Sequence, residues 1–239
     1  MIKNWLITGD CHRDFTRFSN LYFKYEPKET AIIILGDSGI NFYGEAADAL
    51  CKNVLTDMGY TFYIVRGNHD MRPSVLPGIE RWYDAEAGGY VLFEKKWPAI
   101  RYLIDGQTYD FAGTTALVIG GAYSVDKNYR LSRGLEWFPD EQLTAQEMID
   151  IEKQVVGKSF NLILSHTCPL KFQPTDKFLS FIDQSTVDNY MESWMEQLRT
   201  KIKFDCWCFG HYHLERYDAI NKYRIFYYDI VELDKVQMV

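Results

Sequence analysis

The chain lacks long apolar runs, an excess of basic residues and a regular cysteine pattern. None of its apolar segments approaches the roughly 20 residues that span a lipid bilayer, and the apolar stretch at the N-terminus is too short for a signal peptide. The formal net charge of −7 over 239 residues argues against strong nucleic-acid binding, which requires a cationic surface. We therefore expect a protein that binds neither a membrane nor nucleic acid strongly.

Cysteine is present but does not form a disulfide framework. The five cysteines are odd in number and irregularly spaced, whereas small secreted domains repeat a cysteine spacing. This pattern favours the cytoplasm as the location. Cys206 and Cys208 alternate along a strand-like run and are interpreted as buried apolar residues. Repeats, low-complexity tracts and linkers are also missing, so residues 1–239 are predicted to form a single domain.

Histidine is scarce, and none of the five histidines is scattered. Each lies in a short polar motif that follows an apolar run: Gly-Asp-Cys-His (9–12), Gly-Asn-His-Asp (67–70), Ser-His (165–166) and Gly-His-Tyr-His (210–213). A further pair, Gly36-Asp37, ends the apolar run 31–35. Parallel strands collect their binding residues along one sheet edge, and imidazoles with carboxylates are typical metal ligands. The motifs therefore predict a metal site assembled at strand ends.

The segments between these motifs predict an α/β architecture. Apolar runs alternate with helical patterns, including a helix over 45–58 that Gly59 ends, a polar helix from Pro139 to about 156, and an amphipathic helix that begins at 185–186.

Two other segments depart from that alternation. Short β-rich runs between about 90 and 121 indicate hairpins, with Asp105-Gly106 as one of the turns. Residues 167–185 read as a long functional loop.

The complete motif set resembles the calcineurin-like metallophosphoesterases. The order and approximate spacing agree across residues 10–213, with Asp10-x-His12, Gly36-Asp37, Gly67-Asn68-His69-Asp70, His166 and Gly210-His211-x-His213. The resemblance implies the metallo-dependent phosphatase fold, a four-layer α/β/β/α sandwich of two mixed β-sheets flanked by helices. It also implies metal-dependent hydrolysis of a phosphoester.

The same resemblance implies a role for each motif residue. Asp10, His12 and His213 would hold one divalent ion, and Asn68, His166 and His211 a second. Asp37 would bridge the two ions, which would share the attacking hydroxide, and His69 would be the general acid. Mixed nitrogen and oxygen ligands leave the metal open. Manganese is favoured, and iron, zinc, nickel and magnesium are alternatives.

Two departures from the family pattern and one further segment bear on the substrate. Arg13 replaces the glycine that commonly follows the first histidine; it either binds a phosphate oxygen or lies in solvent. Ile40 stands where phosphoprotein phosphatases carry the aspartate that orients the catalytic histidine, so that subfamily is disfavoured. Asp70 could orient His69 instead, or hold its own loop. The Gly-rich segment 120–137 resembles bacterial and phage members, and its Lys127 and Arg130 are candidate substrate contacts or solvated charges.

The leading hypothesis is an intracellular phosphatase or phosphodiesterase for a small phosphorylated substrate, with nucleotide-like molecules as candidates. The first alternative is a phosphoprotein (Ser/Thr) phosphatase, which would share the chemistry. The second is a non-catalytic scaffold with the same fold. A scaffold of this kind typically loses ligands or the acid, and this sequence retains the full set.

Overall fold

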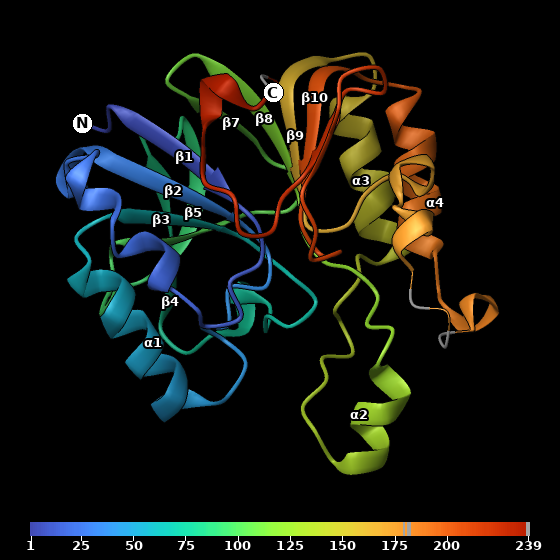
Figure 1. The fold of residues 1–239 in the computed structure, drawn as a ribbon, viewed down its shortest axis with the longest axis horizontal. Coiled ribbons are helices and arrows are strands. Elements are labelled where there is room, and N and C mark those ends of the chain that lie inside the picture. Colours follow the sequence, from blue (N-terminus) through green and yellow to red (C-terminus); the bar gives the residue numbers. More distant parts are fainter. Residues whose placement is uncertain (179, 181–182, 238–239) are drawn as a thin grey trace.

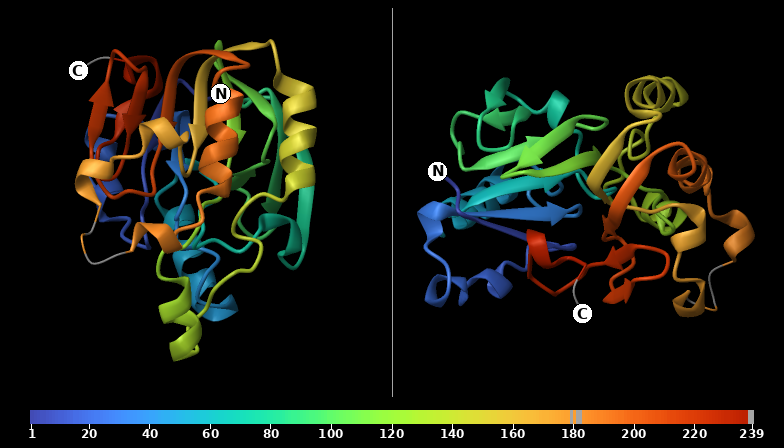
Figure 2. Two further views of the ribbon diagram at one scale, coloured as in Figure 1. Left: turned by 90° about the vertical axis from the view of Figure 1, so that its right-hand side faces the viewer. Right: turned by 90° about the horizontal axis from the view of Figure 1, so that it is seen from above.

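Two β-sheets packed face to face form the centre of the computed structural model, and helices cover their outer faces (Figure 1). The structure describes residues 1–178, 180 and 183–237. Figure 2 shows the same layers from the side and from above. The prediction of a four-layer α/β/β/α sandwich with two mixed sheets is confirmed.

The first sheet has seven strands, in the order β13 (Val231–Glu232), β1 (Asn4–Thr8), β2 (Thr30–Leu35), β3 (Thr61–Val65), β6 (Ile100–Leu103), β5 (Gly89–Glu94) and β4 (Ile79–Asp84). Strands β1, β2, β3 and β6 run parallel, and the outer pairings are antiparallel. Every residue of β2 is buried, because a parallel sheet covered on both faces needs apolar side chains on both.

The second sheet has six strands, in the order β11 (Arg216–Asp218), β12 (Tyr223–Ile225), β10 (Lys203–Phe209), β9 (Ser159–Ser165), β8 (Thr114–Ile119) and β7 (Thr108–Phe111). Strands β8, β9, β10 and β12 run parallel, whereas β7 and β11 pair antiparallel with their neighbours. Parallel strands β1, β2, β3, β9 and β10 each end within two residues of the start of one of the polar motifs.

Three hydrophobic clusters hold the layers together. The cluster between the sheets includes Ile33, Val118 and Cys208. A second joins the outer face of the second sheet to α3 (Ala145–Val155) and α4 (Tyr190–Arg199). The third joins the first sheet to α1 (Glu45–Asp57). Cys206 and Cys208 are buried and free, as predicted.

A further helix, α2 (Lys127–Arg133), projects away from both sheets (Figure 1). The remaining helical elements are single 3-10 turns: Thr16–Phe18, Leu21–Phe23, Pro27–Glu29, Pro73–Val75, Leu170–Phe172, Thr175–Lys177, Gln184–Thr186 and Leu233–Lys235. Within the described ranges, no helix combines the length and the apolar character needed to cross a membrane.

Several local predictions were wrong. The Asp105-Gly106 turn does not close a hairpin, because β6 belongs to the first sheet and β7 to the second; the turn carries the chain between sheets. The polar helix begins at Ala145, where Thr144 forms a capping box, and not at Pro139. The edge strand β4 was not predicted, since most of its residues are exposed and lack an apolar alternation.

The segment 167–185 also differs from a plain loop. The sequence predicted a loop without regular structure here. The described part instead contains two 3-10 turns, Leu170–Phe172 and Thr175–Lys177, and the start of a third at Gln184. Residues 179 and 181–182 of this segment lie outside the described part of the chain. The following helix α4 is shorter than predicted and begins at Tyr190, because a 3-10 turn capped by Asp183 occupies the predicted start.

Candidate metal centre

The polar motifs of the two sheets meet at one edge of the molecule. The ring Nδ1 of His166, which follows β9, lies 2.8 Å from the carbonyl oxygen of Leu35, the last residue of β2. The backbone NH of His211, which follows β10, donates to Oδ1 of Asp10 after β1 at 2.9 Å. The sheets are therefore joined through the motif residues themselves, as the strand-end argument predicts.

The motif residues adopt strained backbone conformations. Seven described non-glycine residues have a positive φ. Four of them belong to the motifs, His12, Asp37, His211 and His213, with φ of 44°, 35°, 67° and 51°, and Arg13, with φ of 71°, directly follows the first motif. The left-handed region costs a non-glycine residue about 1 kcal/mol or more. Such strain collects at functional sites, where the surrounding structure holds it in place.

Two glycines allow the motifs to approach one another. A Cβ on Gly67 would stand 1.9 Å from Oδ1 of Asp37, and one on Gly210 would stand 2.2 Å from Oδ1 of Asp10. Both distances are far below any van der Waals contact. Glycine at these positions is therefore required by close packing against the two carboxylates.

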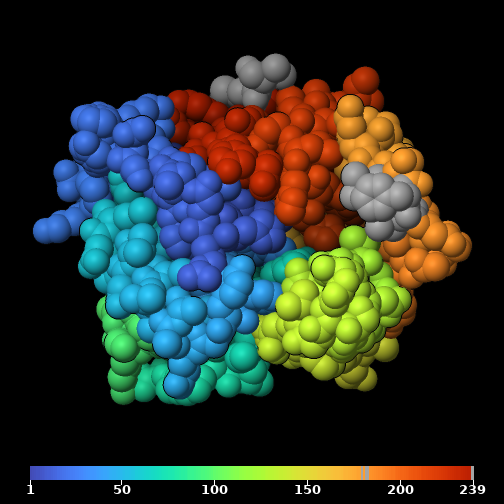
Figure 3. Space-filling view, turned by 60° about the horizontal axis from the view of Figure 1, so that its bottom comes forward, coloured from blue at the N-terminus to red at the C-terminus, as the bar shows by residue number. Residues whose placement is uncertain are grey.

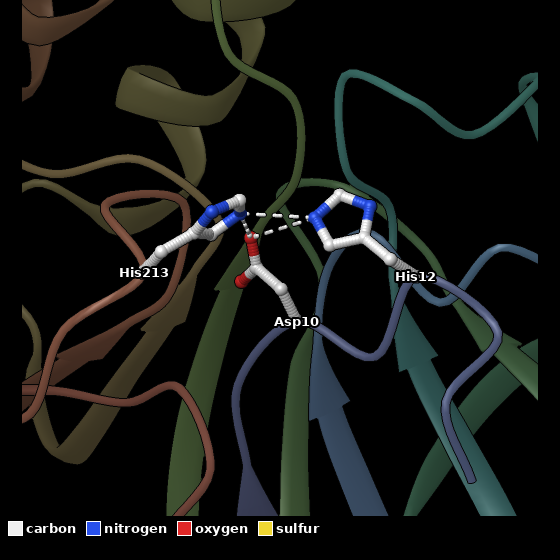
Figure 4. Close-up of side chains that lie close together, drawn as sticks. All are labelled: Asp10, His12 and His213. Atoms are coloured by element: carbon white, nitrogen blue, oxygen red, sulfur yellow. Dashed lines mark hydrogen bonds and ion pairs between the residues drawn. The ribbon is translucent and has the colours of Figure 1, made fainter.

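Asp10, His12 and His213 converge on one point (Figure 4). Oδ2 of Asp10 lies 3.1 Å from Nε2 of His213 and 3.7 Å from Nε2 of His12. The two Nε2 atoms are 2.9 Å apart. Oδ2 is buried and has no hydrogen-bond partner among the described residues. A buried, unsatisfied carboxylate oxygen between two imidazoles fits a divalent cation.

A second group lies deeper. Nδ1 of His166 faces the Leu35 carbonyl, so its hydrogen is there and Nε2 carries the lone pair in the neutral ring. Yet Nε2 lies 2.8 Å from Oδ1 of Asn68, whose amide nitrogen donates to Ser124 Oγ. Two acceptors thus face each other unless a proton or a metal ion lies between them. The ring of His211 is 5.0 Å from that of His166, centroid to centroid.

Asp37 lies between the two groups. Its Oδ1 is 3.5 Å from Nε2 of His166, and its Oδ2 is 3.9 Å from Nε2 of His12. The side chain is 2% exposed, so both oxygens are directed into the protein. The sequence-predicted residues from distant motifs are therefore brought together around two carboxylates.

The electrostatics of the centre also favour a cation. Burial alone would raise the pKa of Asp37, but the neighbouring imidazoles of His166, His69 and His12 lower it below its usual range. Burial would lower the pKa of His166, yet Asp37 and Asp10 raise it to about 9. Burial, and then the adjacent His166, lower the pKa of His211 to about 3. Two buried carboxylates thus stabilise positive charge in the centre.

His69 stands beside the carboxylate between the groups. Its backbone NH donates to Oδ1 of Asp37 at 2.9 Å, and its Nε2 lies 4.0 Å from Oδ2 of Asp37. Nη2 of Arg130 donates to its Nδ1 at 2.9 Å. Burial lowers the pKa of His69, and the Arg130 guanidinium lowers it further. Because a guanidinium can only donate, the hydrogen of the neutral ring resides on Nε2.

The other predicted cations lie away from the two groups. The guanidinium of Arg13 donates to Cys51 Sγ and stacks on Tyr43 at 4.3 Å, and the amine of Lys127 lies over Trp137 at 4.2 Å. Asp70 takes the second of its two predicted options: it accepts from Gly67 NH at 3.0 Å and from Ser38 Oγ at 3.1 Å, which holds the loop.

Sequence reasoning missed the residues that support the deeper group. The hydroxyl of Ser124 accepts from Asn68 and donates to Glu141, a carboxylate that also accepts from the Trp137 indole at 2.9 Å. Arg17 was missed too; it donates to the backbone carbonyl of Asp10 at 2.8 Å. A buried glutamate and serine outside any histidine motif carry no sequence signal for this role.

The segment that supplies Arg130 is termed the arm and comprises residues 123–137. Figure 3 views this edge of the molecule and shows the yellow-green arm beside a recess, across from the blue N-terminal and red C-terminal segments. Helix α2 lies in the arm. Arg130 is anchored there by its own Nε, which donates to Asp126 at 2.7 Å.

Strand-end imidazoles and carboxylates at one edge of an α/β/β/α sandwich define a metal-binding centre of the hydrolase type. The model of the calcineurin-like phosphoesterase family matches residues 4–215, and the chain belongs to that family. The resemblance predicted from the motifs is therefore confirmed.

No curated protein matches the chain. Among solved structures, the chain is similar to phosphopantetheinyl hydrolase (PptH) from Mycobacterium tuberculosis, with 12% sequence identity, a TM-score of 0.45 and coverage of 94% of this chain and 88% of that one. A similarity of this degree carries no information on the substrate.

Proposed function

We propose that this protein hydrolyses a small, nucleotide-like phosphoester with two divalent metal ions held by the motif residues. One ion would be held by Asp10, His12 and His213. The other would be held by Asn68, His166 and His211, and Asp37 would contact both ions. The observation that carries the proposal is the position of Asp37, whose two oxygens face imidazoles of different groups, 3.5 Å and 3.9 Å away. A carboxylate so placed offsets the repulsion between two nearby cations.

The residues around the ions have separate tasks in this proposal. The bound ions would polarise the phosphoryl oxygens and lower the pKa of a water molecule. In its protonated form His69 would deliver one proton to the leaving-group oxygen as general acid and become neutral, and the Arg130 guanidinium beside its Nδ1 favours that neutral form. Gly67 and Gly210 keep the carboxylates within reach of the imidazoles.

The alternative of a phosphoprotein phosphatase has less support. Ile40 is fully buried in the hydrophobic cluster that joins the first sheet to α1. Its apolar side chain cannot form a hydrogen bond that orients His69. The position beside His69 is taken by Arg130 from the arm. A scaffold without activity would not need an unsatisfied buried carboxylate oxygen on Asp10.

Metal-reconstituted protein tests the proposal. The apoprotein, prepared with a chelator, is reloaded separately with Mn²⁺, Fe²⁺, Zn²⁺, Ni²⁺ or Mg²⁺ and assayed with p-nitrophenyl phosphate, bis(p-nitrophenyl) phosphate and a phosphoserine peptide. We expect hydrolysis of a small ester that needs added metal, with Mn²⁺ among the effective ions. Turnover of the peptide alone would favour the phosphoprotein phosphatase, and inactivity with every ion would favour the scaffold.

A further inference from the structure

A small, half-open pocket adjoins the deeper group of the metal centre. Its volume is about 190 Å³, and its lining includes His211, Tyr212, Glu192, Phe178 and Tyr123. His211 is thus shared between the proposed ligand set and this pocket. Ligand pockets for drug-sized molecules measure roughly 300–1,000 Å³, so this one accommodates a single ring system joined to a phosphoryl group at the metal centre.

The pocket combines aromatic walls with one incompletely satisfied carboxylate. The rings of Phe178 and Tyr212 lie nearly parallel, with an interplanar angle of 14° and centroids 6.2 Å apart. Glu192 is 3% exposed. Its Oε1 accepts from Thr167 at 2.7 Å, but its Oε2 has no hydrogen-bond partner among the described residues.

An orphan oxygen of this kind costs free energy in the folded protein. A buried acceptor without a partner destabilises by about 1–3 kcal/mol, and by more when it is charged. Burial accordingly raises the pKa of Glu192 to about 7, and the hydrogen bond from Thr167 only partly opposes this effect. By contrast, the carboxylate of Glu196, also in α4, accepts a hydrogen bond from Nε of Arg199 at 3.1 Å. A donor from a bound molecule would complete the environment of Glu192.

We propose that this pocket binds the nucleobase of the substrate, with the exocyclic amino group of the base donating to Oε2 of Glu192. The inference rests on the proposed function, because it requires the phosphoryl group to lie at the metal centre. A plain aromatic ring would stack on the walls but leave Oε2 unpaired. Sites built around a buried polar group discriminate against analogues that lack its partner.

Binding of nucleosides to metal-free protein tests the pocket without any catalysis. Saturation-transfer NMR is recorded with adenosine, guanosine, cytidine and uridine, and with purine riboside and inosine as analogues without the amino group. We expect transfer to the base protons of at least one amino-bearing nucleoside and a tenfold or greater loss of affinity for its analogue, as for a hydrogen bond to a charged group. Absence of transfer from all four nucleosides would overturn the proposal.

Matched variants identify the residue responsible. Glu192→Gln presents an amide donor to the base and should weaken binding about tenfold or more, and Phe178→Leu should weaken it by removing the aromatic wall. Glu196→Gln, one turn further along α4, should bind as the wild type does. Equal affinity of wild type, Glu192→Gln and Phe178→Leu would contradict the assignment. Thermal unfolding of each variant shows that the comparison is made on folded protein.

The two proposals fail in different ways. In manganese-loaded protein, the ratio of kcat/KM for the corresponding nucleoside monophosphate to that for p-nitrophenyl phosphate should fall about tenfold in Glu192→Gln and stay constant in Glu196→Gln. If generic esters are hydrolysed but the ratio does not change, the base pocket is wrong and the metallophosphoesterase stands. If nucleosides bind but no ester is hydrolysed, the proposed function is wrong.

Discussion

The two halves of the metal centre differ in exposure and in how they are held. The side chains of His12 and His213 are 35% and 47% exposed, whereas that of His166 is 0% exposed. In the deeper half, the ring of His166 is held by the backbone carbonyl of Leu35, and the side chain of Asn68 is held by its hydrogen bond to Ser124. Preorganised ligands with fixed hydrogen-bond partners bind metal more tightly. We therefore expect the deeper half to retain its ion longer than the outer half.

The largest effect is expected from Asp37, because its two oxygens face imidazoles of both halves, His166 and His12. Asp37→Ala should lower metal content at both positions and reduce kcat by about 10³-fold or more, since metal stabilisation is worth several kcal/mol. Asn68→Ala should reduce occupancy mainly in the deeper half. Elemental analysis and steady-state kinetics check this. An Asp37→Ala protein with two equivalents of metal and full turnover would remove the basis for a shared ligand.

The next largest effect is expected from His69, which touches neither half as a ligand. His69→Ala should keep the metal content and lower kcat by about 10²–10⁴-fold, the usual effect of removing a positioned proton donor. The loss should shrink for p-nitrophenyl phosphate, whose leaving group hardly needs a proton. An equal loss for alkyl and nitrophenyl esters would contradict the role of general acid.

Supporting residues should separate the halves more finely. Ser124→Ala removes the partner of Asn68 and should weaken the deeper position about 10–100-fold, the usual range for such contacts. Tyr227 stacks on His213 at 4.8 Å, so Tyr227→Leu should affect the outer position only. Competitive titration with a metal chelator measures both. Equal weakening of the two positions by Ser124→Ala would mean that the halves are not independently supported.

The smallest effect is expected from the arm. Arg130→Ala should lower kcat by a few-fold to about tenfold, since the His69 ring loses one hydrogen bond that holds it in place, worth about 1 kcal/mol net. The matched control is Arg133→Ala in the same helix, where the guanidinium lies by Tyr129 and should have no effect. If Arg133→Ala is as damaging as Arg130→Ala, the arm acts through its overall charge and not through His69.

The sequence predicted the centre better than the parts that support it. Motifs such as 9–12 and 210–213 are short, follow apolar strands and contain the scarce histidines, so local patterns identify them. The strand ends then had to converge, because parallel strands share one carboxyl edge. The left-handed backbone of Asp37 and the close approach of Gly67 to it follow from the same convergence.

The remaining features depend on contacts between distant residues. Arg130 and His69 are 61 positions apart and meet only because the arm folds back to the centre. Glu141 reaches the centre through Ser124, 17 positions away, with no motif to mark either residue. Asp105-Gly106 has the composition of a hairpin turn, but the same composition suits a turn between two sheets. Tertiary packing, not local propensity, decides these cases.

Electron paramagnetic resonance of protein titrated with Mn²⁺ tests the central claim, that two unequal positions share Asp37, most directly. The first equivalent should give the spectrum of an isolated ion in the deeper half, and the second should convert it to a spin-coupled pair. In Asp37→Ala the coupled signal should be lost. A wild-type protein that binds a single equivalent, or two equivalents without coupling, would contradict the account.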